Sequence, residues 1–532
     1  MHEIEIKFQV SPAQRSAVDA AVAGRAPPAR TRLQAAYHDT AERTLAKAGL
    51  ALRLRREGRL WVQTLKGATD DSITRLEHNV PRGRAAAMPP VDPQLHAATP
   101  VGEALLALLA GRDAPALAVV YRTDIRRRAR ALRTPQGRVE LAFDAGSIHA
   151  GDRKAGVLEL EIELLGGSPR AVFDTARRWL ARFDLWLDVR SKAERGDLLA
   201  RGASIAPPRL ASAVRLTPQM TAAQAWQAVL RSCTDQITAN ASQIASGEHG
   251  DEHVHQLRVG LRRLRSALRL FDGLGADAAL AEPAATLFRR LGSARDQVVI
   301  EGEFAAGLLA AMRAAGVAGD APVAAPAHAH VPPTEVLRER SSQTLLLKLL
   351  AACHAPGTDA SQSERQRDSE GERSVVADPS ARVHDRMPVP EPGPEPALAL
   401  RQRLARRLNR WHREVVTDTQ RFAELDDAGR HRLRKRAKRL RYAAEFSAAL
   451  FERRALRRYL RRLRALQERL GALGDVVMAM QAFAPDRDPD RDGDPRAMFA
   501  LGWLAGRREQ LIAAAAPQLK AFGKVERYWK RD

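Results

Sequence analysis

Hydrophobic and polar side chains alternate one by one along the first part of the chain, which is the pattern of β-strands with one face in a core. The alternation is clearest in four runs, at residues 3–7, 50–55, 60–65 and 157–165. One helical pattern interrupts the strands at residues 168–183, where a Ser-Pro pair suits the start of a helix. We therefore expect an α+β domain at residues 1–202.

The pattern changes after residues 203–218, a Pro-containing segment that we interpret as a linker. Beyond it, hydrophobic residues recur at the spacing of amphipathic helices. The runs lie at residues 221–246, 252–272, 399–422, 427–450 and 453–473. Two segments, at about 313–334 and 354–398, lack any period and are predicted to be flexible insertions. The sequence thus predicts an all-α domain at residues 219–532.

The helical region contains an internal repeat. Residues 255–268 and 431–444 both fit the pattern His-x-Leu-Arg-x-x-x-basic-Arg-Leu-Arg-x-Ala, which indicates a duplication. On a helix, the basic residues of each copy fall within one arc of roughly 80°. These two stripes consist of His255, Arg258, Arg262 and Arg265, and of His431, Arg434, Lys438 and Arg441.

The basic stripes indicate a surface that holds an anion. A single basic helix face is more often simply solvated. However, like charges three and four residues apart on a helix repel each other, and both copies of the repeat contain this destabilising arrangement. The whole chain has the same bias, with 86 Lys and Arg against 63 Asp and Glu and a formal net charge of +23. Such a charge favours a polyanionic partner: nucleic acid, an acidic membrane surface or phosphate chains.

Composition narrows the class of protein further. Hydrophobic residues make up 45% and charged residues 28%, which excludes disorder of the whole chain. The sequence has no apolar run long enough for a membrane helix and no signal-peptide pattern at its start, so we expect a cytoplasmic protein without a membrane partner. Cys233 and Cys353 are too few for a disulfide framework. Aromatic residues are only 5% and no base-reading motif occurs, which disfavours nucleic acid as the partner.

Charged residues occupy one face of the predicted strands, and the other face is apolar. Glu3, Glu5 and Lys7 leave the same side of one strand. One such strand is more often a solvated face, but the pattern recurs at Arg53 and Arg55, Arg75 and Glu77, Glu140 and Asp144, and Glu159, Glu161 and Glu163. If helices cover the apolar side, these charges line one lumen. Carboxylates could then hold a divalent cation, and Arg and Lys could hold phosphate oxygens.

These strand motifs together resemble the CYTH domain of the triphosphate tunnel metalloenzymes. The motifs that carry the likeness lie at residues 3–7, 37–40, 50–55, 63–67, 75–77, 144–146, 158–164 and 191–196. The resemblance covers nearly all of residues 1–202. It implies an eight-stranded antiparallel tunnel barrel that hydrolyses triphosphates with Mg²⁺ or Mn²⁺.

The resemblance also implies roles for individual residues. By position, the metal ligands would be Glu3, Glu5 and Glu161, with Asp144, Glu159 and Glu163 as neighbours or alternates. The substrate-binding set would be Lys7, Arg53, Arg55, Lys66, Arg75 and Glu77. Of Arg122, Arg126 and Arg127 on one further strand, we prefer Arg127 for this set. Lys192 resembles the lysine that closes the tunnel onto the substrate.

The helical repeat resembles the CHAD domain, the conserved-histidine α-helical domain. The likeness covers about residues 219–532 without the insertions. It implies duplicated four-helix bundles with a basic groove that binds inorganic polyphosphate. The two histidines of the family correspond to His255 and His431.

Our leading hypothesis is a cytoplasmic, metal-dependent hydrolase that cleaves inorganic tripolyphosphate into pyrophosphate and phosphate. Its helical domain would bind long-chain polyphosphate and could associate with polyphosphate granules. Two alternatives remain: a non-catalytic polyphosphate-binding or targeting protein, and a tunnel enzyme for thiamine triphosphate or a nucleotide. The carboxylates favour the enzyme, because binding alone needs only the basic residues. The fold does not select the substrate, but the helical domain favours inorganic phosphates.

Overall fold

A computed structural model describes residues 2–25, 30–69, 73–110, 116–292, 304–320, 322, 331–355, 395–483 and 494–530. The chain forms two compact units. The first unit consists of residues 1–210, 234–257 and 333–355, and the second of 211–233, 258–332 and 356–532. Most of the predicted insertion at 354–398, and residues 323–330 of the other, lie outside the described residues. Within the described ranges, no helix combines the length and the apolar character needed to cross a membrane.

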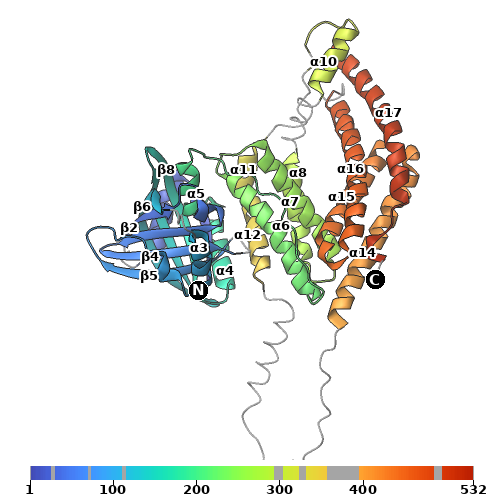
Figure 1. Cartoon of the computed structure of the whole chain (residues 1–532). Helices are drawn as coiled ribbons and strands as arrows, with labels where there is room; N and C mark the ends of the chain where they lie inside the picture. Colours follow the sequence, from blue (N-terminus) through green and yellow to red (C-terminus); the bar gives the residue numbers. More distant parts are fainter. Residues whose placement is uncertain are drawn as a thin grey trace, which may run out of the picture. The chain divides into compact units, whose positions relative to one another are not determined.

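Eight antiparallel strands close into a barrel in the first unit (Figure 1). They are β1 (His2–Val10), β2 (Arg30–Asp39), β3 (Leu50–Glu57), β4 (Leu60–Ala68), β5 (Thr74–Arg84), β6 (Ala118–Thr134), β7 (Gly137–Ala150) and β8 (Arg153–Gly167). Neighbours follow the order β5-β4-β3-β2-β6-β7-β8-β1, and β5 pairs with β1 to close the ring. A short strand, β9 (Leu185–Leu187), adds to β1. The predicted eight-stranded antiparallel barrel is confirmed.

Helices cover the apolar outer face of the barrel, so the charged face points inward. Ile6 and Phe8 of β1 are fully buried, and α4 (Arg170–Arg182) packs against β1, β7 and β8. On the opposite wall, Val101 and Leu105 of α3 (Pro100–Leu109) pack with buried leucines of β3 and β4. Two more helices, α1 (Arg15–Ala23) and α2 (Thr44–Lys47), lie against the ring. This arrangement reverses that of a small barrel with an apolar interior.

The helix that carries Lys192 has a tightly specified start. In α5 (Lys192–Ala200), Ser191 Oγ accepts a hydrogen bond from the Glu194 N–H at 3.1 Å, and Glu194 Oε2 accepts one from the Ser191 N–H at 2.6 Å. This reciprocal capping box fixes the first turn of the helix. Further along, a Cβ on Gly196 would lie 2.3 Å from the Tyr121 ring, so only glycine permits the close approach of α5 to β6.

Helical segments beyond the predicted linker also belong to the first unit. They are the second half of α6 (Ala222–Ala245), the start of α7 (Asp251–Leu270), α11 (Pro333–Arg338) and α12 (Arg340–Cys353). Within this unit, α12 packs against α4 and β9, and α11 packs against β9. The barrel and these helical segments therefore pack as one body.

The second unit is helical, as predicted. Four long helices, α14 (Glu395–Gln420), α15 (Asp427–Phe446), α16 (Arg453–Ala482) and α17 (Pro495–Gly523), pack in sequence, and α14 also packs against α17. They form a bundle (Figure 1). Two shorter helices, α8 (Ala281–Arg290) and α10 (Ala305–Ala314), also belong to this unit, as do the first half of α6 and most of α7. Short 3₁₀ turns occur at Pro12–Gln14, Pro93–His96, Ala278–Leu280, Phe422–Glu424, Ala448–Leu450 and Tyr528–Lys530.

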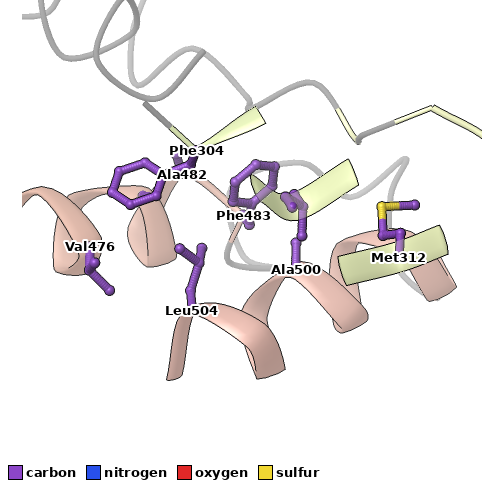
Figure 2. Close-up of a cluster of buried hydrophobic side chains, with 9 residues drawn as sticks. Phe304, Met312, Val476, Ala482, Phe483, Ala500 and Leu504 are labelled. Atoms are coloured by element: carbon purple, nitrogen blue, oxygen red, sulfur yellow. The ribbon is translucent and has the colours of Figure 1, made fainter. Parts of the chain in front are cut away.

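A separate apolar cluster anchors α10 to the ends of α16 and α17 (Figure 2). It contains Phe304, Leu308, Met312, Val476, Ala479, Ala482, Phe483, Ala500 and Leu504. The apolar spacing that continues through Val476 and Ala479 explains why α16 extends to Ala482, beyond the predicted run at 453–473. The predicted insertion at 313–334 begins in the last turn of α10.

Candidate active site

The barrel encloses a cavity of about 510 Å³ with a charged lining. The structure brings together in this lining most of the residues that the sequence singled out in the first domain. They are Glu3, Glu5, Lys7, Arg53, Arg55, Lys66, Arg75, Glu77, Arg127, Asp144, Glu161, Glu163 and Lys192. The remaining predicted residue, Glu159, is fully buried beside Lys192.

Lys192 lies in a cluster of three carboxylates. Its Nζ is 2.6 Å from Glu161 Oε1, 2.7 Å from Glu159 Oε2 and 2.9 Å from Asp144 Oδ2. Burial alone would lower the pKa of Lys192, but these carboxylates outweigh it and hold the pKa well above its usual range. Burial alone would raise the pKa of Glu161, but the charges of Lys192, Arg127 and Lys7 keep it well below its usual range. Lys192 therefore carries its full charge in this cluster, and burial does not neutralise Glu159 or Glu161.

Arg127 provides the second cation of this cluster. Its Nε and Nη2 donate to the two carboxylate oxygens of Asp144, both at 2.7 Å, and Nη2 also donates to Glu161. The register places Arg127 directly opposite Asp144 on β7. Arg122 and Arg126 are exposed, and neither lines the cavity. The structure thus places the preferred arginine inside the barrel and the other two on its outside.

On the wall formed by β4, β5 and β1, two carboxylates share one lysine. Lys66 Nζ lies 2.9 Å from Glu3 Oε2 and 2.6 Å from Glu77 Oε2. Burial and a hydrogen bond with Glu77 raise the pKa of Glu3 to about 8. The single charge of Lys66 therefore does not offset the burial of these two carboxylates and their effect on each other.

Three further carboxylates form a row across adjacent strands. Glu163 of β8 lies opposite Glu5 of β1 and Glu140 of β7. Burial, followed by the charges of Glu5 and Glu140, raises the pKa of Glu163 to about 7. Glu5 Oε1 is buried and accepts no hydrogen bond from any described residue, and Lys7 Nζ is 3.5 Å from it. Negative charge on this wall therefore exceeds the positive charge around it.

This excess of carboxylate fits a divalent cation by its chemistry. Mg²⁺ and Mn²⁺ prefer carboxylate oxygens. The pKa values of Glu3 and Glu163 are raised, and Glu5 Oε1 accepts no hydrogen bond from a described residue. In the described part of the chain, no three or more His, Cys, Asp or Glu side chains are yet grouped as they would be around a metal ion. Glu161, Asp144 and Glu159 contact lysine and arginine instead.

The wall formed by β3 has the opposite imbalance. The Nε–H groups of Arg53 and Arg55 are buried and find no acceptor among the described residues. Arg53 Nη1 donates to the Tyr37 hydroxyl at 3.2 Å, and Arg55 pairs with Glu57. Burial and then the charge of Arg53 lower the pKa of Arg55. Arg75 on β5 lies 3.6 Å from Glu194, a half-exposed partner. These guanidinium groups are therefore available to an anion.

Sequence reasoning gave no role to Tyr37 and Arg195, and it placed Glu140 on the charged face of its strand without including it in the site. Tyr37 stacks on Tyr121 with ring centroids 4.6 Å apart and bonds to Arg53. Glu140 belongs to the carboxylate row, and Arg195 pairs with the buried Glu159. Tyr37 occupies an inward position of its strand, as Glu140 does, so the period-two pattern that identified Glu140 could also have identified Tyr37.

In the second unit, arginines of the first basic stripe gather around one ring. The guanidinium carbons of Arg258, Arg262 and Arg265 lie 5.1, 5.9 and 5.6 Å from the centre of the Phe288 ring of α8. Arg258 Nη1 also donates to the carbonyls of Leu291 and Gly292 at 2.9 and 2.8 Å, just after α8 ends. Stacking on an aromatic face holds cations close together.

The second stripe lies near the first, within the same unit. Burial, followed by the charges of Arg262 on α7 and Arg434 on α15, lowers the pKa of Lys438 to about 7. Burial and neighbouring cations also lower the pKa of His431. Arg434 Nη2 lies 3.2 Å from Asp475, and Arg441 Nη1 lies 3.2 Å from Glu445. His255 precedes Arg258 on α7 but belongs to the first compact unit.

The chain thus combines a closed antiparallel barrel, lined by cations and carboxylates, with helices that carry a duplicated basic motif. The chain carries a CYTH domain, whose family model matches residues 1–196, and a CHAD domain, whose family model matches residues 228–484. Both resemblances inferred from the sequence are thereby confirmed.

Several individual proteins are similar to parts of the chain. An inorganic triphosphatase of Haemophilus influenzae is 30% identical over 165 residues, which are 31% of this chain and 44% of that protein. The match therefore spans less than half of the relative. The CHAD domain of Ricinus communis is 24% identical and covers 60% of this chain and 98% of its own, with a TM-score of 0.43. A Hippeastrum protein described as having a dominant triphosphatase activity is 15% identical, covers 38% of this chain and 97% of its own, and has a TM-score of 0.27.

Proposed function

We propose that the barrel hydrolyses inorganic tripolyphosphate to pyrophosphate and phosphate in a metal-dependent reaction. The CYTH domain and the similarity to an inorganic triphosphatase support a triphosphatase kind of activity. One observation carries the proposal: the same cavity holds guanidinium Nε–H groups without an acceptor among the described residues, and a row of carboxylates whose mutual repulsion raises the pKa of Glu163. A binding protein for phosphate chains would need only the first of these.

The residues of the cavity divide the work of phosphoryl transfer, which depends mainly on positioning and on neutralising charge. Arg53, Arg55 and Lys66 hold the phosphate oxygens and fix the orientation of the chain. Arg127 and Lys192 add positive charge on the opposite side. Glu3, Glu5 and Glu163 would hold a divalent cation, which supplies Lewis-acid charge to the phosphate. The enclosing barrel limits access of bulk water, so each of these charges acts more strongly than it would in solution.

We further propose that the basic stripes of the CHAD domain bind long-chain polyphosphate. The support is the concentration of positive charge: three arginines surround Phe288, and neighbouring cations help to shift the pKa of Lys438 to about 7. Holding like charges this close costs energy in the free protein. A polyanion would recover that energy, and it would also raise the proton affinity of Lys438 and His431.

The catalytic proposal predicts a substrate profile. The purified full-length protein should release phosphate from tripolyphosphate with Mg²⁺ or Mn²⁺ and should lose this activity when the metal is chelated. Because the cavity offers charges rather than a nucleoside site, kcat/KM should be higher for tripolyphosphate than for ATP or thiamine triphosphate. Phosphate release from tripolyphosphate, ATP, thiamine triphosphate and long-chain polyphosphate would be measured under one set of conditions. A preference for ATP or thiamine triphosphate would contradict the inorganic substrate, and no release at all would favour the non-catalytic alternative.

The polyphosphate proposal predicts the effect of neutralising the stripes. Replacing Arg262, Arg265 and Arg441 with Ala should weaken binding of long-chain polyphosphate and reduce its dependence on salt, because fewer counterions are released. Arg258 is left in place because it bonds to the carbonyls after α8. The control replaces three exposed arginines of α16 (Arg453, Arg454 and Arg457) and removes the same charge. Equal losses of affinity in both variants would show that polyphosphate is held only by non-specific attraction to a positively charged protein. Competition by duplex DNA as strong as by polyphosphate, at the same phosphate concentration, would show the same.

A further inference from the structure

Lys192 reaches the barrel through the connection between β9 and α5, residues 188–191. Side chains from distant helices bind two backbone N–H groups in or beside this connection. Gln343 Oε1 on α12 accepts a hydrogen bond from the Leu187 N–H at 2.7 Å. Ser242 Oγ on α6 accepts one from the Val189 N–H at 3.1 Å. Gln343 and Ser242 lie in the first compact unit, together with the barrel.

Both helix residues are buried and held in place. Gln343 and Ser242 are each only 1% exposed. Gln343 Nε2 donates a hydrogen bond to the Leu337 carbonyl at 2.6 Å, and Ser242 Oγ donates one to the Leu187 carbonyl at 3.4 Å. Gln243 Oε1 accepts a further hydrogen bond from Arg190 Nη1 at 3.0 Å. A buried polar side chain on a helix is costly unless it is bonded. Three of these side-chain oxygens have their partners on Leu187, Val189 and Arg190.

The other side of the connection is attached to the barrel. Asp188 is fully buried, and its N–H donates to the Lys7 carbonyl of β1 at 3.0 Å. Asp188 also accepts hydrogen bonds from the Arg190 N–H at 3.0 Å and from Gln9 Nε2 at 3.1 Å. Gln9 Nε2 in turn donates to Glu159 at 3.0 Å, and Glu159 contacts Lys192. One network therefore extends from the helices to the lysine.

We propose that Gln343 and Ser242 are positioning residues for Lys192, so that helices of the CHAD domain set the geometry of the triphosphate site. The proposal deepens the catalytic function proposed above and rests on it. Neither residue reaches the cavity. They act by holding the backbone of Leu187 and Val189, from which Lys192 is only a few residues away. Displacement of a charged group by about 1 Å can cost on the order of 100-fold in rate, so this support matters for turnover.

The test uses the full-length protein with Ser242→Ala and Gln343→Met, separately and together. Both changes remove the acceptor and leave a side chain of similar or smaller size. We expect kcat/KM for tripolyphosphate to fall by about 10-fold in the double variant. Ser242→Thr, which keeps the hydroxyl, should retain activity. The matched controls are Thr238→Val on α6 and Ser342→Ala on α12, because these hydroxyls bond only to carbonyls of Thr234 and Val336.

A double-mutant cycle distinguishes positioning from general stability. If the helix residues act through Lys192, the pair of changes should cost nothing more in a Lys192→Met background. Additive losses would overturn the proposal.

Amide hydrogen exchange of residues 185–195 gives a readout independent of catalysis. The double variant should exchange faster at Leu187 and Val189, and the controls should not. Unchanged protection would overturn the proposal even if the wild type is active. If the wild type hydrolyses nothing, the catalytic function fails by itself. In that case, the affinity for tripolyphosphate would be measured by calorimetry for the same set of variants. Together with the exchange data, these affinities would still show whether Gln343 and Ser242 position Lys192.

Discussion

Replacing Glu5 with Gln is expected to lower turnover of tripolyphosphate by on the order of 100-fold or more, because loss of a carboxylate ligand removes several kcal/mol of charge stabilisation by the metal. The side chain keeps its shape. The fold should not suffer, since Glu5 repels Glu163 in the free protein, where the pKa of Glu163 is raised to about 7. The melting temperature should therefore stay constant or rise. The expected signature is lost activity with retained stability.

The measurement is a titration of phosphate release against Mg²⁺ and Mn²⁺, together with thermal unfolding without metal. The control is Glu103→Gln, the same chemical change at an exposed position of α3 outside the barrel. Activity of Glu5→Gln close to the wild type at saturating metal would remove Glu5 from the metal site. A normal maximum reached only at higher metal concentration would instead limit its role to metal affinity.

The barrel strands could be predicted from the sequence because the pattern that specifies each strand lies within a few consecutive residues. Glu3, Glu5 and Lys7 alternate with apolar residues, and such a strand has two distinct faces wherever it is placed. The covering helix at residues 168–183 was also visible, although α4 begins at Arg170. The closing pair between β1 and β5 joins residues about 70 positions apart. The resemblance to a known family supplied that closure, which the periodicity alone could not.

The details that remained open depend on register and on long-range contacts. The chain has three consecutive arginines at 126–128, and only the pairing of Arg127 with Asp144 across β6 and β7 decides which one lies inside the barrel. The roles of Ser242 and Gln343 could not be inferred from the sequence. A polar residue within the apolar stripe of a helix can be assigned a role only when its hydrogen-bond partner is known. The partners here are backbone groups of β9 and the connection after it.

Removing Lys192 is expected to affect both turnover and stability, and the two effects can be separated. Lys192→Met leaves Asp144, Glu159 and Glu161 with fewer cations. Breaking a buried ion pair from one side costs about 3–5 kcal/mol, so the melting temperature should fall. Loss of one preorganised cation facing the phosphate should also lower kcat by about 100-fold to 1,000-fold.

A second change tests which effect causes the loss of activity. In the double variant Lys192→Met with Glu159→Gln, one negative charge is removed together with the lysine's positive charge, so the buried cluster regains its charge balance and stability should recover in part. Turnover should not recover, because Glu159 does not line the cavity and cannot replace the lysine. Both kcat and the melting temperature would be measured, with Lys154→Met on an exposed part of β8 as the control. Recovery of turnover together with stability would show that Lys192 maintains the fold of the barrel rather than acting on the triphosphate.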